Sequence, residues 1–470
     1  MGYGLPTNYV SGNHSHWTFR GFWLEAVVAL PRGDLMRRIL RTLIRTETIL
    51  LVAFAALSFA VAPAQAWTYK PLYSFCSDGS CYDGQSPLGG LTLDAQGNLF
   101  GTAYGGVRRE GVAYELVRPT EGDTWKEHVL YNFCASCQKG NYPADAPLIL
   151  DSAGNLYGIG GGGKEAAGVV FRLLRGHNGK RWTQQVLYTF CKKDSSCRDG
   201  LYPITGLTYS GAGTGAAYDG VSPLFGVTQQ GGKYHSGIAY TLTPRPTQEW
   251  KLEVLYDFCK DSRCKEGGPM NALLADASGN LIGPAPNRKG TILKVSTTAA
   301  RHSPAANVLY RFCSLPDCLD GKYPSGIATD GAGDLIGATV GGGTNRDKKL
   351  YCYGGCGTLY QLAPDGTETV LYNFCSLRNC ADGRRPNSVS VSGSGDVFGT
   401  TGVAAGYYKA TIFQYSAGAL QTLYTFCAQN GCPDGVAAAG PLVLDSSDNV
   451  FGITTEGGPR NAGTVFELSP

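Results

Sequence analysis

Leu72-Tyr73-Ser74-Phe75-Cys76 is the first of seven copies of one five-residue pattern, Leu-Tyr-x-Phe-Cys. The copies begin at Leu72, Leu130, Leu187, Leu255, Leu309, Leu371 and Leu423. Their starts are spaced by 52 to 68 residues. Self-similarity at such a period indicates a tandem-repeat architecture, in which each unit buries its apolar surface against its neighbours.

The rest of each unit supplies three further strands. A second cysteine and a Gly-containing turn follow each copy, and a hairpin signature comes next. In the first unit the hairpin reads Leu91-Thr92-Leu93-Asp94-Ala95-Gln96-Gly97-Asn98-Leu99-Phe100-Gly101. Its Asp can accept hydrogen bonds from backbone N–H groups of the turn, and Gly and Asn tolerate positive φ. A Gly-rich loop and a last strand complete a unit of four short strands, which is typical of a propeller blade.

The phase of the repeat predicts how the ring closes. The repeat region opens with a Leu-Tyr-x-Phe-Cys strand and finishes with the other three strands of a unit. The strand near Leu72–Cys76 can therefore complete the sheet formed by residues 441–468. We predict an all-β fold for residues 67–470, a seven-bladed β-propeller with four-stranded blades, closed by pairing of the N-terminal strand with the C-terminal blade. A linear array is the alternative, but it would expose apolar faces at both ends.

The segment before the repeats has the features of an export signal. Arg37, Arg38 and Arg41 precede an apolar run of 14 residues, Ile49 to Ala62, which is too short for an ordinary membrane span. Ala64-Gln65-Ala66 then supplies a small-x-small cleavage site. We interpret residues 36–66 as a signal peptide and residues 1–35 as a mis-called extension or a disordered segment. An unusually long positive region is the alternative.

The charge balance of the repeat region gives no electrostatic reason to expect a polyanionic partner. The first 66 residues hold six Lys+Arg and three Asp+Glu of the 40 and 37 in the chain, so residues 67–470 carry 34 of each sign. We therefore expect no nucleic-acid partner and no membrane association after signal cleavage. We predict a soluble monomer, secreted or periplasmic.

All 16 cysteines fall into local pairs, which suits an exported protein. The predicted disulfides are Cys76/Cys81, Cys134/Cys137, Cys191/Cys197, Cys259/Cys264, Cys313/Cys318, Cys352/Cys356, Cys375/Cys380 and Cys427/Cys432. Zinc is the alternative, because Cys134-Ala135-Ser136-Cys137 is a C-x-x-C. A zinc site needs four ligands at one place, and pairs in separate blades cannot easily meet.

The repeated motifs carry a resemblance to a known family. Leu-Tyr-x-Phe, then Gly-Leu-x-x-Asp-x-x-Gly-Asn-Leu-Phe/Tyr-Gly-Thr, then Gly-Thr-Val-Phe-x-Leu, resemble the GloVer tandem-repeat proteins of bacteria over nearly all of residues 67–470. The resemblance implies an exported protein with propeller-like repeats and without assigned catalytic residues. Members of that family carry C-terminal anchors, and this sequence departs from them in showing none.

Two sets of aspartates and one histidine are the site candidates. Asp83, Asp199, Asp320, Asp382 and Asp434 precede Gly after the second cysteine of five units and would form a partial acidic ring. Asp-Gly is also a common turn pair, and we favour the turn. A second set, headed by Asp94, occupies the hairpin turns, where one Asp per turn offers too few ligands for calcium. His235 is the most loop-like of the histidines.

Two classes of function remain open. The first is an exported binding or interaction scaffold for carbohydrate or protein ligands, with no cofactor and no metal. The alternative is an extracellular enzyme, such as a polysaccharide hydrolase or lyase, with its active site in the propeller channel. That enzyme would need paired carboxylates converging there. Because the repeats build a scaffold, we expect function where units three to five depart from the pattern.

Overall fold

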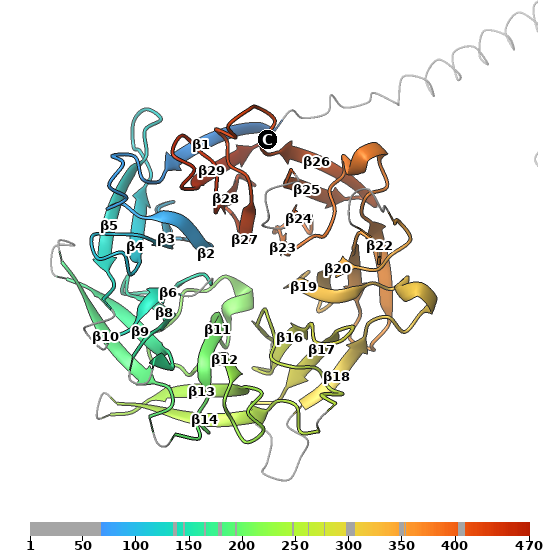
Figure 1. Ribbon diagram of the computed structural model, residues 1–470, viewed down its shortest axis with the longest axis horizontal. Coiled ribbons are helices and arrows are strands. Elements are labelled where there is room, and N and C mark those ends of the chain that lie inside the picture. The colour runs from blue at the N-terminus through green and yellow to red at the C-terminus, as the bar shows by residue number, and fades with distance from the viewer. Residues whose placement is uncertain are drawn as a thin grey trace, which may run out of the picture. The chain divides into compact units, whose positions relative to one another are not determined.

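The computed structural model describes residues 67–470 apart from 135–138, 144–145, 164–165, 177–180, 193–194, 247–248, 262, 277, 298–305, 347–351, 353 and 403–408. The predicted extension and signal peptide, residues 1–35 and 36–66, lie outside the described residues. Among the described residues, no helix has the length and apolar character needed to cross a lipid bilayer. The described chain forms seven antiparallel sheets that are arranged as the blades of a β-propeller (Figure 1).

Each blade contains four strands, named in order from the centre of the ring outward. Blade 1 is β2 (Gln85–Leu93), β3 (Leu99–Tyr104), β4 (Val112–Val117) and β5 (Lys126–Asn132). Blade 2 has a divided inner strand, β6 (Asn141–Pro143) and β7 (Ile149–Leu150), then β8 (Leu156–Gly161), β9 (Val169–Arg175) and β10 (Trp182–Thr189). Blade 3 is β11 (Leu201–Tyr209), β12 (Leu224–Gln230), β13 (Ile238–Pro244) and β14 (Trp250–Asp257). Blade 4 is β15 (Leu274–Ala275), β16 (Leu281–Ala285), β17 (Thr291–Val295) and β18 (Ala306–Arg311).

The remaining three blades follow the same order. Blade 5 is β19 (Lys322–Thr329), β20 (Leu335–Gly341), β21 (Thr358–Leu362) and β22 (Glu368–Asn373). Blade 6 is β23 (Ser388–Val391), β24 (Val397–Thr401), β25 (Thr411–Ser416) and β26 (Ala419–Thr425). Blade 7 is β27 (Ala438–Leu444), β28 (Val450–Thr454), β29 (Thr464–Ser469) and β1 (Thr68–Ser74). Short 3-10 helices occur in loops at η4 (Ala212–Thr214), η5 (Pro316–Cys318) and η6 (Arg378–Cys380).

The ring closes as the sequence predicts. β1 is the outer strand of blade 7 and pairs antiparallel with β29, so that Thr68 lies opposite Ser469 and Tyr73 opposite Val465. Figure 1 shows the blue β1 beside the dark red β29 on the rim of the ring. Blade 7 therefore joins the first described strand to the last and has four strands like its neighbours, blades 6 and 1.

The Leu-Tyr-x-Phe-Cys strand is the outer strand of every blade, and its Leu forms a β-bulge. In β1, Pro71 pairs with Phe466 and Tyr73 with Val465, which leaves Leu72 without a partner residue. The same register shift occurs at the motif Leu of the other six blades. A bulge increases the local twist of the strand that carries it. The recurrent Leu thus marks the point where each outer strand bends, and this feature was not predicted.

Seven apolar clusters fill the seven junctions between blades. At the first junction the ring of Phe75, from blade 7, meets the buried ring of Tyr114 in blade 1 at 5.0 Å between centroids. Gly101 on β3 lies under that tyrosine, and an added Cβ would come within 2.4 Å of its Oη. The Gly of the Leu-Phe-Gly motif therefore makes room for an aromatic ring at the junction.

Seven of the eight predicted disulfides are present in the described residues. They join Cys76 to Cys81, Cys191 to Cys197, Cys259 to Cys264, Cys313 to Cys318, Cys352 to Cys356, Cys375 to Cys380 and Cys427 to Cys432. Cys134 is also disulfide-bonded, but Cys137 lies outside the described residues, so that pairing stays a prediction.

Six of these bridges close the loop that follows an outer strand, and both cysteines of each have positive φ, as in Cys76 (60°) and Cys81 (56°). Non-glycine residues avoid this region. Each disulfide thus holds its loop in a backbone conformation that non-glycine residues do not favour.

The second cysteine of each repeated bridge also closes the Gly-containing turn that follows it. Cys197, Cys264 and Cys432 are half-buried, with φ of 50°, 44° and 46°. Their backbone carbonyls accept hydrogen bonds, at 2.9 to 3.1 Å, from the N–H groups three residues later, which belong to Gly200, Gly267 and Gly435. These cysteines therefore have a structural role in their loops.

Candidate functional site

Two faces of the ring carry different loops, because neighbouring strands in each blade run in opposite directions. One face carries the loops from each outer strand to the next inner strand, which hold the six repeated disulfides, and the loops between the second and third strands. We call it the disulfide face. The opposite face carries the hairpins between the first and second strands and the loops before the outer strands. We call it the hairpin face.

The five aspartates predicted as ligand-face candidates lie in the disulfide loops and accept hydrogen bonds there. Each accepts a bond from the motif tyrosine ten or eleven residues earlier, at 2.6 to 3.0 Å, and these bonds are Tyr73–Asp83, Tyr188–Asp199, Tyr310–Asp320, Tyr372–Asp382 and Tyr424–Asp434. Asp320 and Asp382 also accept from two backbone N–H groups each. Asp199, Asp320 and Asp382 are at most 3 % exposed.

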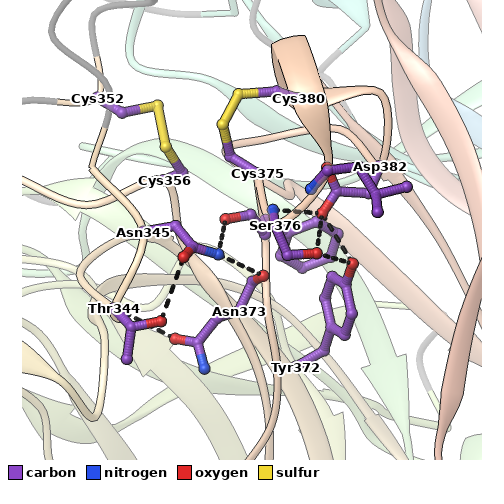
Figure 2. The surroundings of a disulfide bond; sticks show 12 residues. Thr344, Asn345, Cys352, Cys356, Tyr372, Asn373, Cys375, Ser376, Cys380 and Asp382 are labelled. Carbon is purple, nitrogen blue, oxygen red and sulfur yellow. Dashed lines mark hydrogen bonds between the residues drawn. A yellow bond between two sulfur atoms is a disulfide. The ribbon is translucent and has the colours of Figure 1, made fainter.

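Figure 2 shows this arrangement at the sixth disulfide loop. The Oδ2 atom of Asp382 receives bonds from the Tyr372 hydroxyl, the Ser376 hydroxyl and the Ser376 N–H, at 2.7 to 2.9 Å. Burial, together with the charge of Asp382, raises the pKa of Tyr372 to about 12, so the hydroxyl remains a donor at neutral pH. These contacts support the turn interpretation, because the carboxylates are engaged within their own loops.

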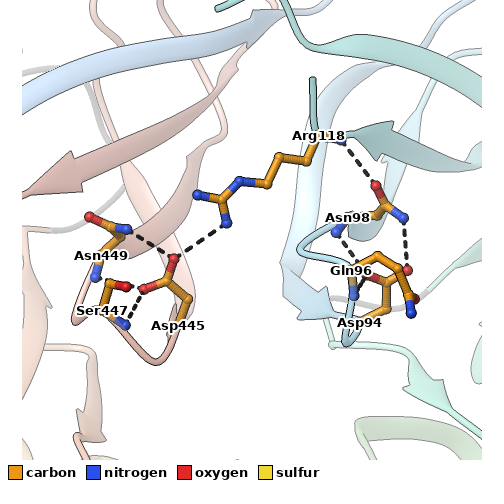
Figure 3. A network of polar contacts seen from close by, with 7 residues as sticks. All are labelled: Asp94, Gln96, Asn98, Arg118, Asp445, Ser447 and Asn449. Atoms are coloured by element: carbon orange, nitrogen blue, oxygen red, sulfur yellow. Dashed lines mark hydrogen bonds and ion pairs between the residues drawn. The ribbon is translucent and has the colours of Figure 1, made fainter. Parts of the chain in front are cut away.

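The hairpin aspartates behave in the same way on the opposite face. Asp94 accepts bonds from the backbone N–H groups of Gln96 and Asn98, at 2.9 and 2.8 Å. Figure 3 shows the matching turn at Asp445, whose Oδ2 also lies 3.5 Å from a guanidinium nitrogen of Arg118 in the next blade. Every hairpin loop carries an Asp, the seven being Asp94, Asp151, Asp219, Asp276, Asp330, Asp396 and Asp445.

His235 lies on the disulfide face at the turn between β12 and β13. It is exposed, its φ is 58°, and its backbone N–H donates to the carbonyl of Gly232 at 3.3 Å. The neighbouring Lys233 lies 5.4 Å from the centroid of the Tyr234 ring. His235 lies in a loop, as the sequence predicts. Within the described residues, its imidazole has no catalytic partner.

The central cavity is lined by the inner strands of all seven blades and has a volume of about 390 Å³. Its lining consists of Gly, Ala, Pro, Leu, Ile and Val with the polar side chains of Thr205, Tyr209, Asn271, Ser325, Asn387 and Ser388. Within the described residues, no Asp, Glu, His, Lys or Arg lines this cavity. The channel therefore lacks, in that part of the chain, the paired carboxylates that glycoside hydrolysis requires.

Three exposed tyrosines at the disulfide-face ends of inner strands were missed by the sequence analysis. Tyr142, Tyr202 and Tyr323 are 46 %, 45 % and 43 % exposed, with φ of 41°, 58° and 57°. Each precedes a proline, and the residue before a proline favours extended backbone. A bulky residue at positive φ costs on the order of 1–3 kcal/mol, and such residues cluster at functional sites. We call these three residues the tyrosine rim.

One repeated hydrogen bond holds the tyrosine rim in this conformation. The N–H groups of Tyr142, Tyr202 and Tyr323 each donate, at 2.8 Å, to a carbonyl in the second loop of the preceding blade. Those carbonyls belong to Glu110, Ala167 and Lys289. Ser86 and Arg385 occupy the same position in blades 1 and 6 and make the same bond. This hydrogen bond fixes the backbone at the end of the inner strand. The motif Gly-x-Tyr-Pro, which occurs in three units, is the sequence signal from which the tyrosine rim could have been predicted.

Two disulfides, Cys352–Cys356 and Cys375–Cys380, lie beside each other in blade 5. The sulfur atoms of Cys356, Cys375 and Cys380 lie within 4.8 Å of one another. Asn345 fixes the intervening loop by donating from its side-chain nitrogen to the carbonyls of Asn373 and Phe374, both at 3.0 Å (Figure 2). In this structure the cysteines are disulfide-bonded and offer no thiolate to a metal.

Comparisons with known proteins identify a repeat family. Residues 285–470 match the family model of the Gloeobacter/Verrucomicrobia repeat. No curated protein matches the chain in sequence.

Solved structures with a similar arrangement of strands share 10 % sequence identity with this chain. One is the extracellular domain of a protein from B. thetaiotaomicron described as a hybrid two-component system, with a TM-score of 0.46 and 85 % of this chain covered. This chain spans 39 % of the length of that domain. Another is a protein of Thermus thermophilus described as an oxidoreductase (glucose dehydrogenase), with a TM-score of 0.37, 86 % of this chain and 100 % of that chain covered.

Proposed function

We propose that this chain, whose residues 285–470 match the Gloeobacter/Verrucomicrobia repeat, is a non-catalytic carbohydrate-binding propeller. The ligand binds across the disulfide face, at the tyrosine rim. The observation that carries the proposal is the conformation of the rim, because three half-exposed tyrosines keep a positive φ that glycine would adopt without strain.

The chemistry of tyrosine suits a sugar ligand. A phenol ring offers a flat apolar face to the C–H groups of a sugar, and its hydroxyl can bond to sugar hydroxyls. The three rings stand on separate blades, each at the end of an inner strand, rather than in one contiguous apolar patch. Tyr104 extends the surface by packing edge-to-face on Tyr142 at 6.0 Å between centroids. Separate aromatic faces match successive sugar units of a polymer better than the apolar centre of a protein interface.

The rigidity of the scaffold supports the same function. Disulfides and buried aspartates fix the loops of the disulfide face, so little conformational freedom is lost when a ligand binds. Local disulfides of this number persist in oxidising compartments. We therefore place the protein outside the cytoplasm, secreted or periplasmic, and keep the signal peptide at residues 36–66 as part of this proposal.

The experiment measures binding to a panel of soluble polysaccharides by affinity electrophoresis and calorimetry. The test variant changes Tyr142, Tyr202 and Tyr323 to glycine, which accepts positive φ. We expect at least a tenfold loss of affinity together with an unchanged or higher melting temperature, so that unfolding does not explain the loss. Val221→Ala, at an exposed residue of the hairpin face, is the control and should bind as the parent does.

Two outcomes oppose the proposal. If the glycine variant binds the retained polysaccharides as tightly as the parent protein, the tyrosine rim is not the binding site. If the parent protein releases new reducing ends from any polysaccharide, the protein is an enzyme and the non-catalytic assignment fails.

A further inference from the structure

Blade 4 carries a basic pocket on the disulfide face, beside the tyrosine rim. Four cationic side chains, Lys265, Arg288, Lys289 and Arg311, line a hollow of about 250 Å³. They come from three segments: the loop from β14 to β15, the turn between β16 and β17, and the end of β18. All four are exposed. Segments far apart in the sequence thus place four positive charges around one small volume.

The cations of this pocket are not neutralised by ion pairs within the described residues. None of the ion pairs there joins any of the four to a carboxylate. The nearby Asp261 is engaged in its own turn, where it accepts from the backbone N–H groups of Arg263 and Lys265 at 3.0 and 3.3 Å. Glu266 is half-buried, and its Oε2 atom is buried without a hydrogen-bond partner among the described residues, so it is not paired with the cations of the pocket. Arg311 donates to the carbonyl of Lys265, which orients its guanidinium beside the pocket.

A direct contact joins this pocket to the proposed sugar site. The carbonyl of Lys289 accepts the hydrogen bond, at 2.8 Å, that holds Tyr323 in its left-handed conformation. The ammonium group of Lys322 lies 5.3 Å from the centroid of the Tyr323 ring and adds a further positive charge. An aromatic face and a cationic pocket therefore lie on adjacent blades and share one backbone contact.

The opposite face also carries charges, since each of its seven hairpin loops holds an Asp. The two faces are separated by strands of five to seven residues in most blades, which corresponds to roughly 17–23 Å at about 3.3 Å per residue. The Debye length at physiological ionic strength is about 8 Å, so the two fields are largely screened from each other. Residues 67–470 are neutral overall, but the electrostatic field at blade 4 is locally positive.

From these contacts we infer that the ligand of the disulfide face is an anionic polysaccharide, and that the basic pocket of blade 4 binds its carboxylate or sulfate groups. The inference rests on the proposed carbohydrate-binding function and specifies its ligand. A sugar ring packs on Tyr323 while an acidic group of the same or the next sugar reaches Arg288 and Lys289. Arginine and lysine bind such oxyanions through charge-assisted hydrogen bonds.

The test compares ligands that differ in charge and not in backbone. Polygalacturonate is measured against the same polymer with its carboxyl groups methyl-esterified, at two salt concentrations, with the parent protein and with Arg288→Gln/Lys289→Gln. We expect the parent to bind the charged polymer at least tenfold more tightly than the ester, and the double variant to lose this difference. Arg181→Gln/Arg245→Gln, on the hairpin face, is the matched control and should retain it.

The outcomes distinguish the proposed carbohydrate-binding function from the inference that its ligand is anionic. Equal binding of the ester and the acid by the parent overturns the anionic assignment and leaves the carbohydrate site standing. Loss of all binding in the tyrosine-to-glycine variant, with the charge preference intact in the parent, supports both. Tighter binding of duplex DNA than of polygalacturonate overturns the polysaccharide assignment. If the parent binds neither the acid nor the ester nor any other polysaccharide, the proposed function itself fails.

Discussion

The hydroxyl of Tyr372 donates a hydrogen bond to Oδ2 of Asp382 at 2.8 Å, and this bond joins an outer strand to the disulfide loop that follows it. The same pair of residue types makes the same bond in four other blades. It explains why the repeat contains both the tyrosine of Leu-Tyr-x-Phe-Cys and the aspartate of Asp-Gly. The pair is a structural unit of the repeat, and its removal can be measured as a loss of stability.

Asp382→Ala should destabilise the protein by about 2–3 kcal/mol, because it leaves two backbone N–H groups and two hydroxyls without their charged acceptor. Tyr372→Phe removes only one of these bonds and should cost about 1 kcal/mol. Urea denaturation at pH 7 measures both values. Asp365→Ala, at an exposed turn on the hairpin face, is the control. Equal costs for Asp382→Ala and Asp365→Ala would contradict the account of the loop.

Two half-buried glutamates should make the free energy of unfolding fall as the pH rises. Burial, with the charge of Asp83, raises the pKa of Glu127 to about 8, and burial, with the charge of Asp320, raises the pKa of Glu368 to about 7. In the unfolded chain both titrate near 4.5. Above that pH the unfolded state loses protons that the folded state keeps, so the free energy of unfolding falls as pH rises from about 4.5 to 8.

The matching variant is Glu127→Gln/Glu368→Gln, which should flatten that decline and leave the protein more stable than the parent at pH 8. Denaturant titrations at several pH values between 4 and 9 give the slope. Glu253→Gln, at an exposed residue beside Lys251, should leave the slope in place. A parent protein whose stability rises steadily over this range would show that these carboxyls ionise freely in the folded state.

A cavity on the hairpin face between blades 4 and 5 can be made smaller by one substitution. It has a volume of about 340 Å³ and is lined by Leu274, Ile282, Leu309, Leu335 and Leu362 among other residues. Ile282 stands where five blades have Phe or Tyr, as at Phe100 of β3. Ile282→Phe should therefore stabilise the protein by about 1 kcal/mol. Ile336→Phe, the same position in blade 5 but outside this cavity, should be neutral or destabilising. Thermal unfolding distinguishes the two variants.

Removal of β1 tests the closure of the ring. Deletion of residues 67–74 leaves β29 as an open edge and exposes apolar side chains at the junction of blades 7 and 1, where Leu72 is 8 % exposed. We expect aggregation or loss of cooperative unfolding. A synthetic peptide of residues 67–76 added during refolding should restore a single transition. A deleted protein with the parent's melting temperature would show that blade 7 does not need its outer strand.

The sequence was sufficient for features that depend on local spacing. The seven blades, the pairing of Thr68–Ser74 with Thr464–Ser469 and seven disulfides follow from motifs whose members lie within one unit or from the phase of the repeat. The β-bulge at Leu72 was not predicted, because a period of two in the strand gives no sign of an extra residue. Sequence reasoning also missed the tyrosine rim, since a residue before proline is expected to be extended.

The basic pocket could not be predicted for a different reason. Lys265, Arg288 and Arg311 are separated by more than 20 residues each along the chain, and only the return of three segments to one end of blade 4 brings them together. Net charge is a sum over the molecule and contains no information about which loops share a face. The same limit applied to Cys356 and Cys375, whose sulfur atoms proved to be neighbours.

The position of β1 in blade 7 has a consequence for biosynthesis. The strand of the ring that is translated first must wait for the strand that is translated last, because its partner β29 ends at Ser469. Six blades can assemble while the chain is still growing, but the seventh cannot. A polypeptide that stops short of its final strands therefore keeps an unpaired edge, which chaperones and proteases recognise. Ring closure thereby makes synthesis of β29 a condition for escaping degradation.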